Sequence, residues 1–115
     1  MKPKGSFILI DDDKEEHDLF KHVLKKLCTN EVKSAYDGED GLSLIKSNKT
    51  NIFMVISDIN MPRMNGLQLK RVIEGTPELK LRSIPFVFKP AIVTPFSSER
   101  LLRWAYRDLS INPGI

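Results

Sequence analysis

The sequence has 115 residues, of which 41% are hydrophobic and 29% are charged, and these values fit one compact domain, residues 1–115. It contains no apolar run of about 18 residues and no signal-peptide core, so we expect no membrane association and a cytoplasmic location. The net charge is +3, but the basic residues are spread along the chain, which argues against a nucleic-acid surface. A lone cysteine, Cys28, excludes an internal disulfide.

Short apolar runs alternate with segments that have apolar residues at helical spacing. Such runs predict strands buried on both faces, and the spaced segments predict amphipathic helices. The predicted elements, in chain order, are a strand at Phe7–Ile10, a helix at Lys14–Cys28, a strand at Glu31–Tyr36, a turn at Asp37–Gly38, a helix at Gly41–Ser47, a strand at Ile52–Ile56, a helix from about Gly66 to Gly75, a strand at Ile84–Phe88 and a last helix after Ser97 or Ser98. This alternation predicts an α/β fold with a parallel sheet and right-handed crossovers.

Side-chain patterns add detail to two helices. Asp13 is the predicted N-cap of the first helix, and His17 and His22 are expected to be ordinary helix-face histidines. The helix that begins near Gly66 is predicted to have Leu69, Val72 and Ile73 on its inner face. We expect Trp104, on the last helix, to serve in packing or to face a partner.

Carboxylates follow two of the most apolar strands. Asp11, Asp12 and Asp13 follow the first strand, and Asp58 follows the third. Ligands of open parallel sheets bind beyond the carboxyl ends of the strands, so Asp11, Asp12 and Asp58 would converge if these strands are neighbours. A hard cation such as Mg²⁺ would relieve their repulsion. The alternative is that the first three aspartates form only a solvated loop and a helix cap.

Three motifs together resemble the receiver domains of two-component response regulators. They are Ile8-Leu9-Ile10-Asp11-Asp12-Asp13, the turn Asp37-Gly38 with Gly41-Leu42, and Asp58-x-x-Met61-Pro62-x-Met64-x-Gly66. The resemblance runs from residue 6 to about residue 88. It implies a flavodoxin-like, doubly wound parallel sheet with strand order 2-1-3-4 and a missing or displaced fifth strand.

The resemblance also implies roles for individual residues. Asp58 would be the phosphoacceptor, and Asp12, Asp58 and the backbone carbonyl of Asn60 would ligate Mg²⁺, with Asp11 holding the ion through water. The chain would catalyse only its own phosphorylation and dephosphorylation. Its expected partners are a histidine kinase or histidine phosphotransfer protein and a downstream protein target.

The last third of the sequence departs from the family pattern. In the family, a Ser or Thr after the fourth strand and a Lys, followed by Pro, after the fifth strand contact the phosphoryl oxygens. In this sequence the hydroxyl position falls at Pro90, and the Lys-Pro pair, with Lys89 as the candidate phosphate-contacting residue, stands early, at Lys89-Pro90. Three interpretations remain. The domain is shortened, or an internal segment is absent from the sequence. The third interpretation, which we favour slightly, is that the domain ends before its fifth strand and that residues 100–108 form a fourth helix. With a continuous chain, the Lys89 side chain need not point at Asp58. An open fourth strand would be covered by residues 91–95 or by a second copy in a homodimer.

Two other functions compete with the phosphoacceptor hypothesis. The triplet Asp11-Asp12-Asp13 formally fits the Asp-x-Asp signature of haloacid-dehalogenase phosphatases, but that family gives no reason for the loop at Asp58. A pseudo-receiver, which binds partners without being phosphorylated, would explain the missing hydroxyl and the displaced Lys89. The retained carboxylates oppose it, because buried like charges without a function are costly.

Overall fold

The computed structural model describes residues 5–27, 30–90 and 98–109. Its elements are β1 (Ser6–Ile10), α1 (Lys14–Leu27), β2 (Val32–Ala35), α2 (Gly38–Ser47), β3 (Ile52–Ser57), α3 (Gly66–Gly75), α4 (Pro77–Lys80), β4 (Phe86–Phe88) and α5 (Ser98–Asp108). The strands form one parallel sheet in the order β2-β1-β3-β4, as predicted. Within the described ranges no helix is long and apolar enough to cross a membrane.

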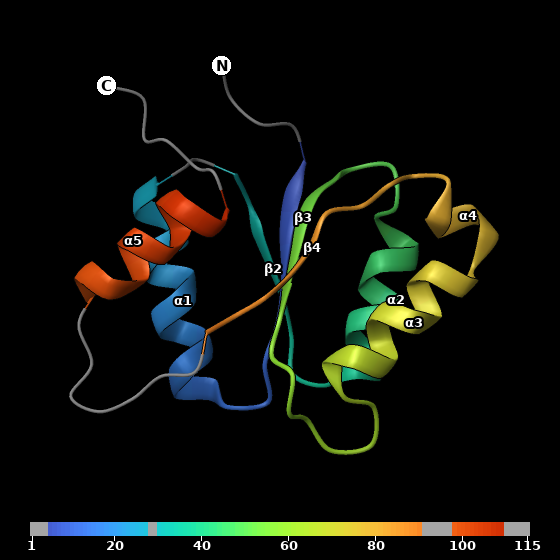
Figure 1. The fold of residues 1–115 in the computed structure, drawn as a ribbon, viewed down its shortest axis with the longest axis horizontal. Coiled ribbons are helices and arrows are strands. Elements are labelled where there is room, and N and C mark those ends of the chain that lie inside the picture. Colours follow the sequence, from blue (N-terminus) through green and yellow to red (C-terminus); the bar gives the residue numbers. More distant parts are fainter. Residues whose placement is uncertain (1–4, 28–29, 91–97, 110–115) are drawn as a thin grey trace.

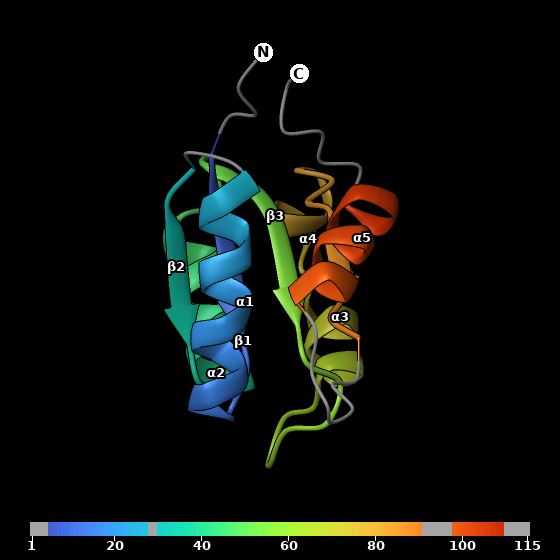
Figure 2. The same ribbon diagram turned by 90° about the vertical axis from the view of Figure 1, so that its left-hand side faces the viewer.

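Two helical layers sandwich the sheet (Figure 1). One layer contains α1 and α5, and Figure 2 looks onto this face. The other contains α2, α3 and α4. Alternate strand residues supply the two cores, so that Phe7 and Leu9 belong to the cluster under α1 and α5, whereas Ile8 and Ile10 belong to the cluster under α2 and α3. Both faces of β1 are therefore buried.

Local capping fixes where the helices begin. The Asp13 carboxylate accepts hydrogen bonds from the backbone N–H groups of Glu15 and Glu16, at 2.9 and 3.2 Å, which confirms it as the cap of α1. Asp37 caps α2 in the same way through the N–H of Asp40. Helix α2 consequently begins at Gly38, three residues before the predicted start, because what was interpreted as a turn is the helix cap.

The helix over residues 98–108 corrects the favoured interpretation of the last third. Leu101, Trp104 and Ala105 are buried against the core that also contains Phe20 of α1, so α5 lies on the α1 face. A right-handed crossover leading from β4 to a further strand would place its helix on the α2 and α3 face. The helix is therefore not a fourth crossover helix. Within the described ranges no fifth strand is present.

Two smaller predictions also need correction, and one short helix was missed. Val72 was expected on the inner face of α3 but is 36% exposed, because the buried stripe of α3 comprises only Gly66, Leu69 and Ile73. His17 was expected to be an ordinary helix-face residue but is fully buried. The short helix α4 was not predicted, although Pro77 occupies a first-turn position that favours proline. Trp104 packs edge-on against Phe20, which agrees with a packing role.

Candidate functional site

The site lies at the carboxyl end of the sheet, where three strands deliver polar residues in register. Ile10 pairs with Ser57, and Ser57 pairs with Phe88. The ladder extends one residue further, because the backbone N–H of Asp58 donates to Ile10 (2.9 Å) and that of Lys89 donates to Ser57 (2.9 Å). Asp11, Asp58 and Lys89 therefore occupy one row across β1, β3 and β4.

Side-chain alternation gives all three residues of this row the same direction. Leu9, Ile56 and Val87 stand two positions earlier and pack in the core under α1 and α5. Because side chains two residues apart on a strand share a face, Asp11, Asp58 and Lys89 also project toward the α1 side. Lys89 therefore lies on the same side of the sheet as Asp58, while its ion pairs are with Asp11 and Glu16 rather than with the acceptor.

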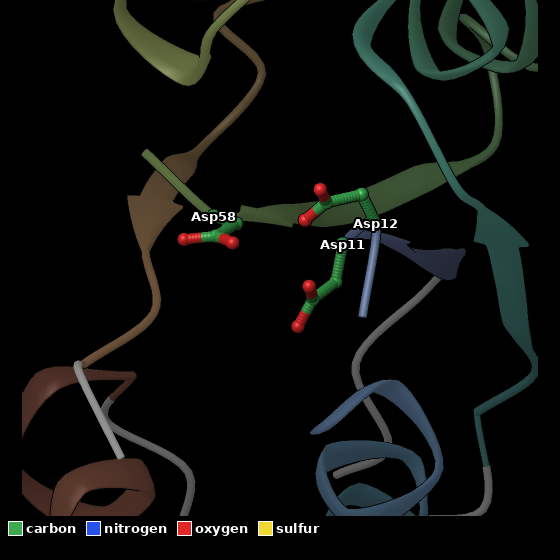
Figure 3. A group of neighbouring side chains, drawn as sticks. All are labelled: Asp11, Asp12 and Asp58. Atoms are coloured by element: carbon green, nitrogen blue, oxygen red, sulfur yellow. The ribbon is translucent and has the colours of Figure 1, made fainter. Parts of the chain in front are cut away.

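The three predicted carboxylates converge. Asp11, Asp12 and Asp58 each offer an oxygen atom such that the three atoms lie within 4.8 Å of one another. Figure 3 shows the three side chains side by side at the ends of the strands, with Asp58 following β3 and the other two following β1. Asp11 is completely buried, Asp58 is half-buried and Asp12 is exposed. The cluster thus extends from the protein interior to the solvent-exposed surface.

The donor set fits a hard divalent cation. The Asp11 Oδ1 atom accepts a hydrogen bond from the Asp13 backbone N–H at 2.9 Å. Its Oδ2 atom is buried and lies 2.8 Å from Lys89 Nζ, but it has no well-directed hydrogen bond. A buried carboxylate oxygen in this condition, beside two further carboxylates, matches the oxygen ligands that Mg²⁺ prefers. The role of the Asn60 carbonyl as a further ligand stays a prediction.

Burial sets the protonation behaviour of Asp58. Desolvation raises the pKa of this carboxyl group above its ordinary value, and the nearby Asp11 carboxylate raises it further. The Lys89 ammonium and hydrogen bonding by the backbone of Asn60 and Ile59 lower the pKa in part. The net effect leaves the Asp58 anion less stabilised than in water. A positive charge placed beside Asp58 would therefore stabilise its anion.

Lys89 is the cation of the site. Its side chain is 2% exposed, and its ammonium lies 2.8 Å from Asp11 Oδ2 and 3.1 Å from Glu16 Oε1. The Phe20 ring centroid is 4.7 Å from the same nitrogen. Burial lowers the pKa of Lys89, but the bonds to Asp11 and Glu16 outweigh it, and the net direction is upward. Lys89 is therefore held as a cation.

Sequence reasoning missed two residues around this row. The sequence pattern gave Glu16 no role in the site, yet it is an ion-pair partner of Lys89. His17 is buried beside the cluster, stacks on Tyr36 with ring centroids 4.6 Å apart, and has no hydrogen bond at either ring nitrogen. Burial is the main reason that its pKa is lowered. Apolar spacing could have placed His17 inward, since it stands three residues before Phe20.

The family's hydroxyl has no counterpart at the end of β4. Lys89 and Pro90 follow the strand directly. The nearby hydroxyl residues Thr94 and Ser97 lie outside the described residues, as does the segment 91–95 that was expected to cover β4. Cys28 lies outside them too.

Comparison with known proteins agrees with this geometry. The sequence profile of the response regulator receiver domain matches residues 7–90. The chemotaxis protein CheV3 of Helicobacter pylori is 29% identical over 105 residues, 84% of this chain and 33% of CheV3. A probable chemotaxis protein CheY of Rhizobium etli is 30% identical over 77 residues, 67% of this chain and 58% of that protein. The chain thus spans less than two thirds of the length of either relative.

A solved structure has the same fold. CheY of Borrelia burgdorferi, in a complex with CheX, BeF3 and Mg²⁺, has a TM-score of 0.65 over 94% of this chain and 90% of its own, with 17% identity. Fold and site define a receiver-type α/β domain. The chain belongs to the response regulator receiver domain family.

Proposed function

We propose that this chain accepts a phosphoryl group on Asp58 in a two-component phosphorelay. The observation that carries the proposal is the row of Asp11, Asp58 and Lys89, in which half-buried Asp58 follows the strand that lies between those ending at Asp11 and Lys89, and the buried Asp11 and Lys89 side chains form an ion pair. Receiver-domain family membership supports it. The expected donors are a histidine kinase or a histidine phosphotransfer protein, and the expected reader is a downstream protein target.

The proposed transfer is a displacement at phosphorus. An Asp58 carboxylate oxygen forms the new P–O bond while the P–N bond of a phosphohistidine breaks, and the departing imidazole nitrogen takes up a proton. Burial raises the free energy of the Asp58 anion, which favours its reaction to an acyl phosphate. The Lys89 ammonium can offset the negative charge of that acyl phosphate. Asp12, Asp58 and the Asn60 carbonyl would hold Mg²⁺ directly and Asp11 would hold it through water. When bound, the cation offsets charge on the transferring oxygens.

Intact mass after incubation with acetyl phosphate and Mg²⁺ tests the proposal. The wild-type chain should gain the mass of one phosphoryl group, and Asp58→Asn should gain none. Asp13→Asn is the matched control, because asparagine keeps the helix cap and the substitution removes one carboxylate beside the cluster. It should be modified like the wild type. A modified Asp58→Asn chain, or an unmodified wild type with Mg²⁺ bound, would contradict the assignment.

A pseudo-receiver is the second candidate, favoured by one observation. Among the described residues, the ion-pair partners of Lys89 are Asp11 and Glu16, and Asp58 is not one of them. Together with Pro90 at the hydroxyl position, this arrangement would suit a module that binds proteins without phosphorylation. The acetyl phosphate experiment separates the two candidates, since a pseudo-receiver gains no mass.

A further inference from the structure

The Lys89 ammonium is engaged on the α1 side of the carboxylate cluster. Its two ion-pair partners are Asp11, at the end of β1, and Glu16, in the first turn of α1. Its third neighbour, the Phe20 ring, also belongs to α1. The ammonium thus donates a hydrogen bond to Glu16 and forms an ion pair with Asp11, and among the described residues no such bond joins it to Asp58.

Glu16 differs from Asp11 in its exposure to solvent, which decides how easily each carboxylate can release the Lys89 ammonium. The Asp11 side chain is fully buried, whereas the Glu16 side chain is 29% exposed. Releasing a buried carboxylate from its only cation is costly, but a carboxylate at the surface can turn to water with a much smaller loss. Glu16 also sits in the first turn of α1, where the helix dipole favours an anion even without the lysine. Lys89 can therefore break its contact with Glu16 at a lower cost in free energy than its contact with Asp11.

We propose that Glu16 is a positioning residue that holds Lys89 toward α1 and competes for its ammonium with the phosphoryl group on Asp58. The inference rests on the proposed phosphoacceptor function and adds a regulatory element to it. Phosphorylation would transfer one ammonium hydrogen bond from Glu16 to a phosphoryl oxygen, while Lys89 keeps its contact with Asp11. The Glu16 carboxylate would then turn outward at the start of α1, where a partner could read the change.

Binding of beryllofluoride with Mg²⁺, a phosphoryl analogue that needs no covalent transfer, measures the competition. Glu16→Gln should bind beryllofluoride roughly three- to tenfold more tightly than the wild type, because a neutral amide holds the ammonium less strongly than a partly exposed carboxylate does. Glu15→Gln is the matched control, since it removes the same charge from the same helical turn at an exposed position. It should bind like the wild type. Equal affinity of Glu16→Gln and the wild type would overturn the inference.

A double variant distinguishes competition for the lysine from simple charge repulsion. In a Lys89→Met background, Glu16→Gln should have no effect on beryllofluoride affinity, whereas repulsion would persist there. Because Lys89→Met removes the cation beside the buried Asp11 carboxylate and thereby destabilises the fold, a structure of the beryllofluoride complex provides an independent test. The Glu16–Lys89 bond should be broken in it, and an intact bond would overturn the inference. Absence of beryllofluoride binding in the wild type would instead refute the phosphoacceptor function and the inference with it.

Discussion

Substitution of Gly66, the first residue of α3, tests how tightly the acceptor loop is packed. A Cβ atom built at this position meets the backbone oxygen of Asp58, lies 3.0 Å from the Phe88 ring and lies 3.1 Å from the Cα atom of Ile59. Two of these three contacts are with backbone atoms, which cannot rotate away as a flexible side chain can. Gly66→Ala therefore requires the backbone that carries the acceptor to move.

The structure sets the expected magnitude. Overpacking of this kind costs about 1–3 kcal/mol. Replacing glycine by alanine in a helix returns up to about 1 kcal/mol, and less at a terminal position. We expect Gly66→Ala to lower the free energy of unfolding by about 1–2 kcal/mol. Gly75→Ala, at the other end of α3, has nothing within 4 Å of the new methyl group and should be neutral or stabilising by up to about 1 kcal/mol.

Urea denaturation followed by Trp104 fluorescence measures both variants. The protein has a single tryptophan, and it is 6% exposed between α5 and α1, so its emission reports the loss of the core. The rate of phosphorylation by acetyl phosphate should also fall in Gly66→Ala and stay unchanged in Gly75→Ala. Equal stabilities of the two variants would refute the packing argument.

Three further predictions concern charge. Mg²⁺ should raise the thermal midpoint of the wild type but not of Asp12→Ala, and equal shifts in calorimetry would contradict the metal site. Asp58→Asn should raise the urea midpoint of the metal-free protein at neutral pH, because burial raises the Asp58 pKa and disfavours its anion. The gain in stability should grow as pH rises above the ordinary aspartate pKa, and an unchanged or lower midpoint would contradict this. Because the pKa of His17 is lowered in the folded protein, the unfolded chain binds a proton at this residue more readily, and stability should fall as pH drops below about 6.5. His17→Phe should lessen that fall. Equal dependence of stability on pH in the two proteins, measured by urea denaturation at several pH values, would refute the prediction.

The strands and the carboxylates that follow them could be predicted because their signals are local, whereas the order of the strands was implied by the resemblance to receiver domains. Each buried strand is a short apolar run, and Asp11 and Asp58 follow two such runs directly. The cap Asp13 is likewise specified by its own neighbours. The fold then brings the strand ends together, which is a property of parallel sheets rather than of any one residue.

What could not be predicted depends on register between distant segments. The direction of Lys89 follows from the pairing of Phe88 with Ser57 and of Ser57 with Ile10, which no single segment specifies. The stacking of His17 on Tyr36, which follows β2, likewise joins two segments that are separate in the sequence. Helix α5 could have followed either face of the sheet, and its apolar side was compatible with both.

The bond between Glu16 and Lys89 joins residues 73 positions apart in the chain. Contacts of such separation form late in folding, because the loop-closure entropy must be overcome first. Strand β4 is also the shortest strand and lies at the edge of the sheet, where local opening costs the least free energy. Whenever β4 detaches, the carboxylates keep their places on β1 and β3 but lose their lysine. Hydrogen exchange at the amide of Lys89 would thus report how often the site exists without its own cation.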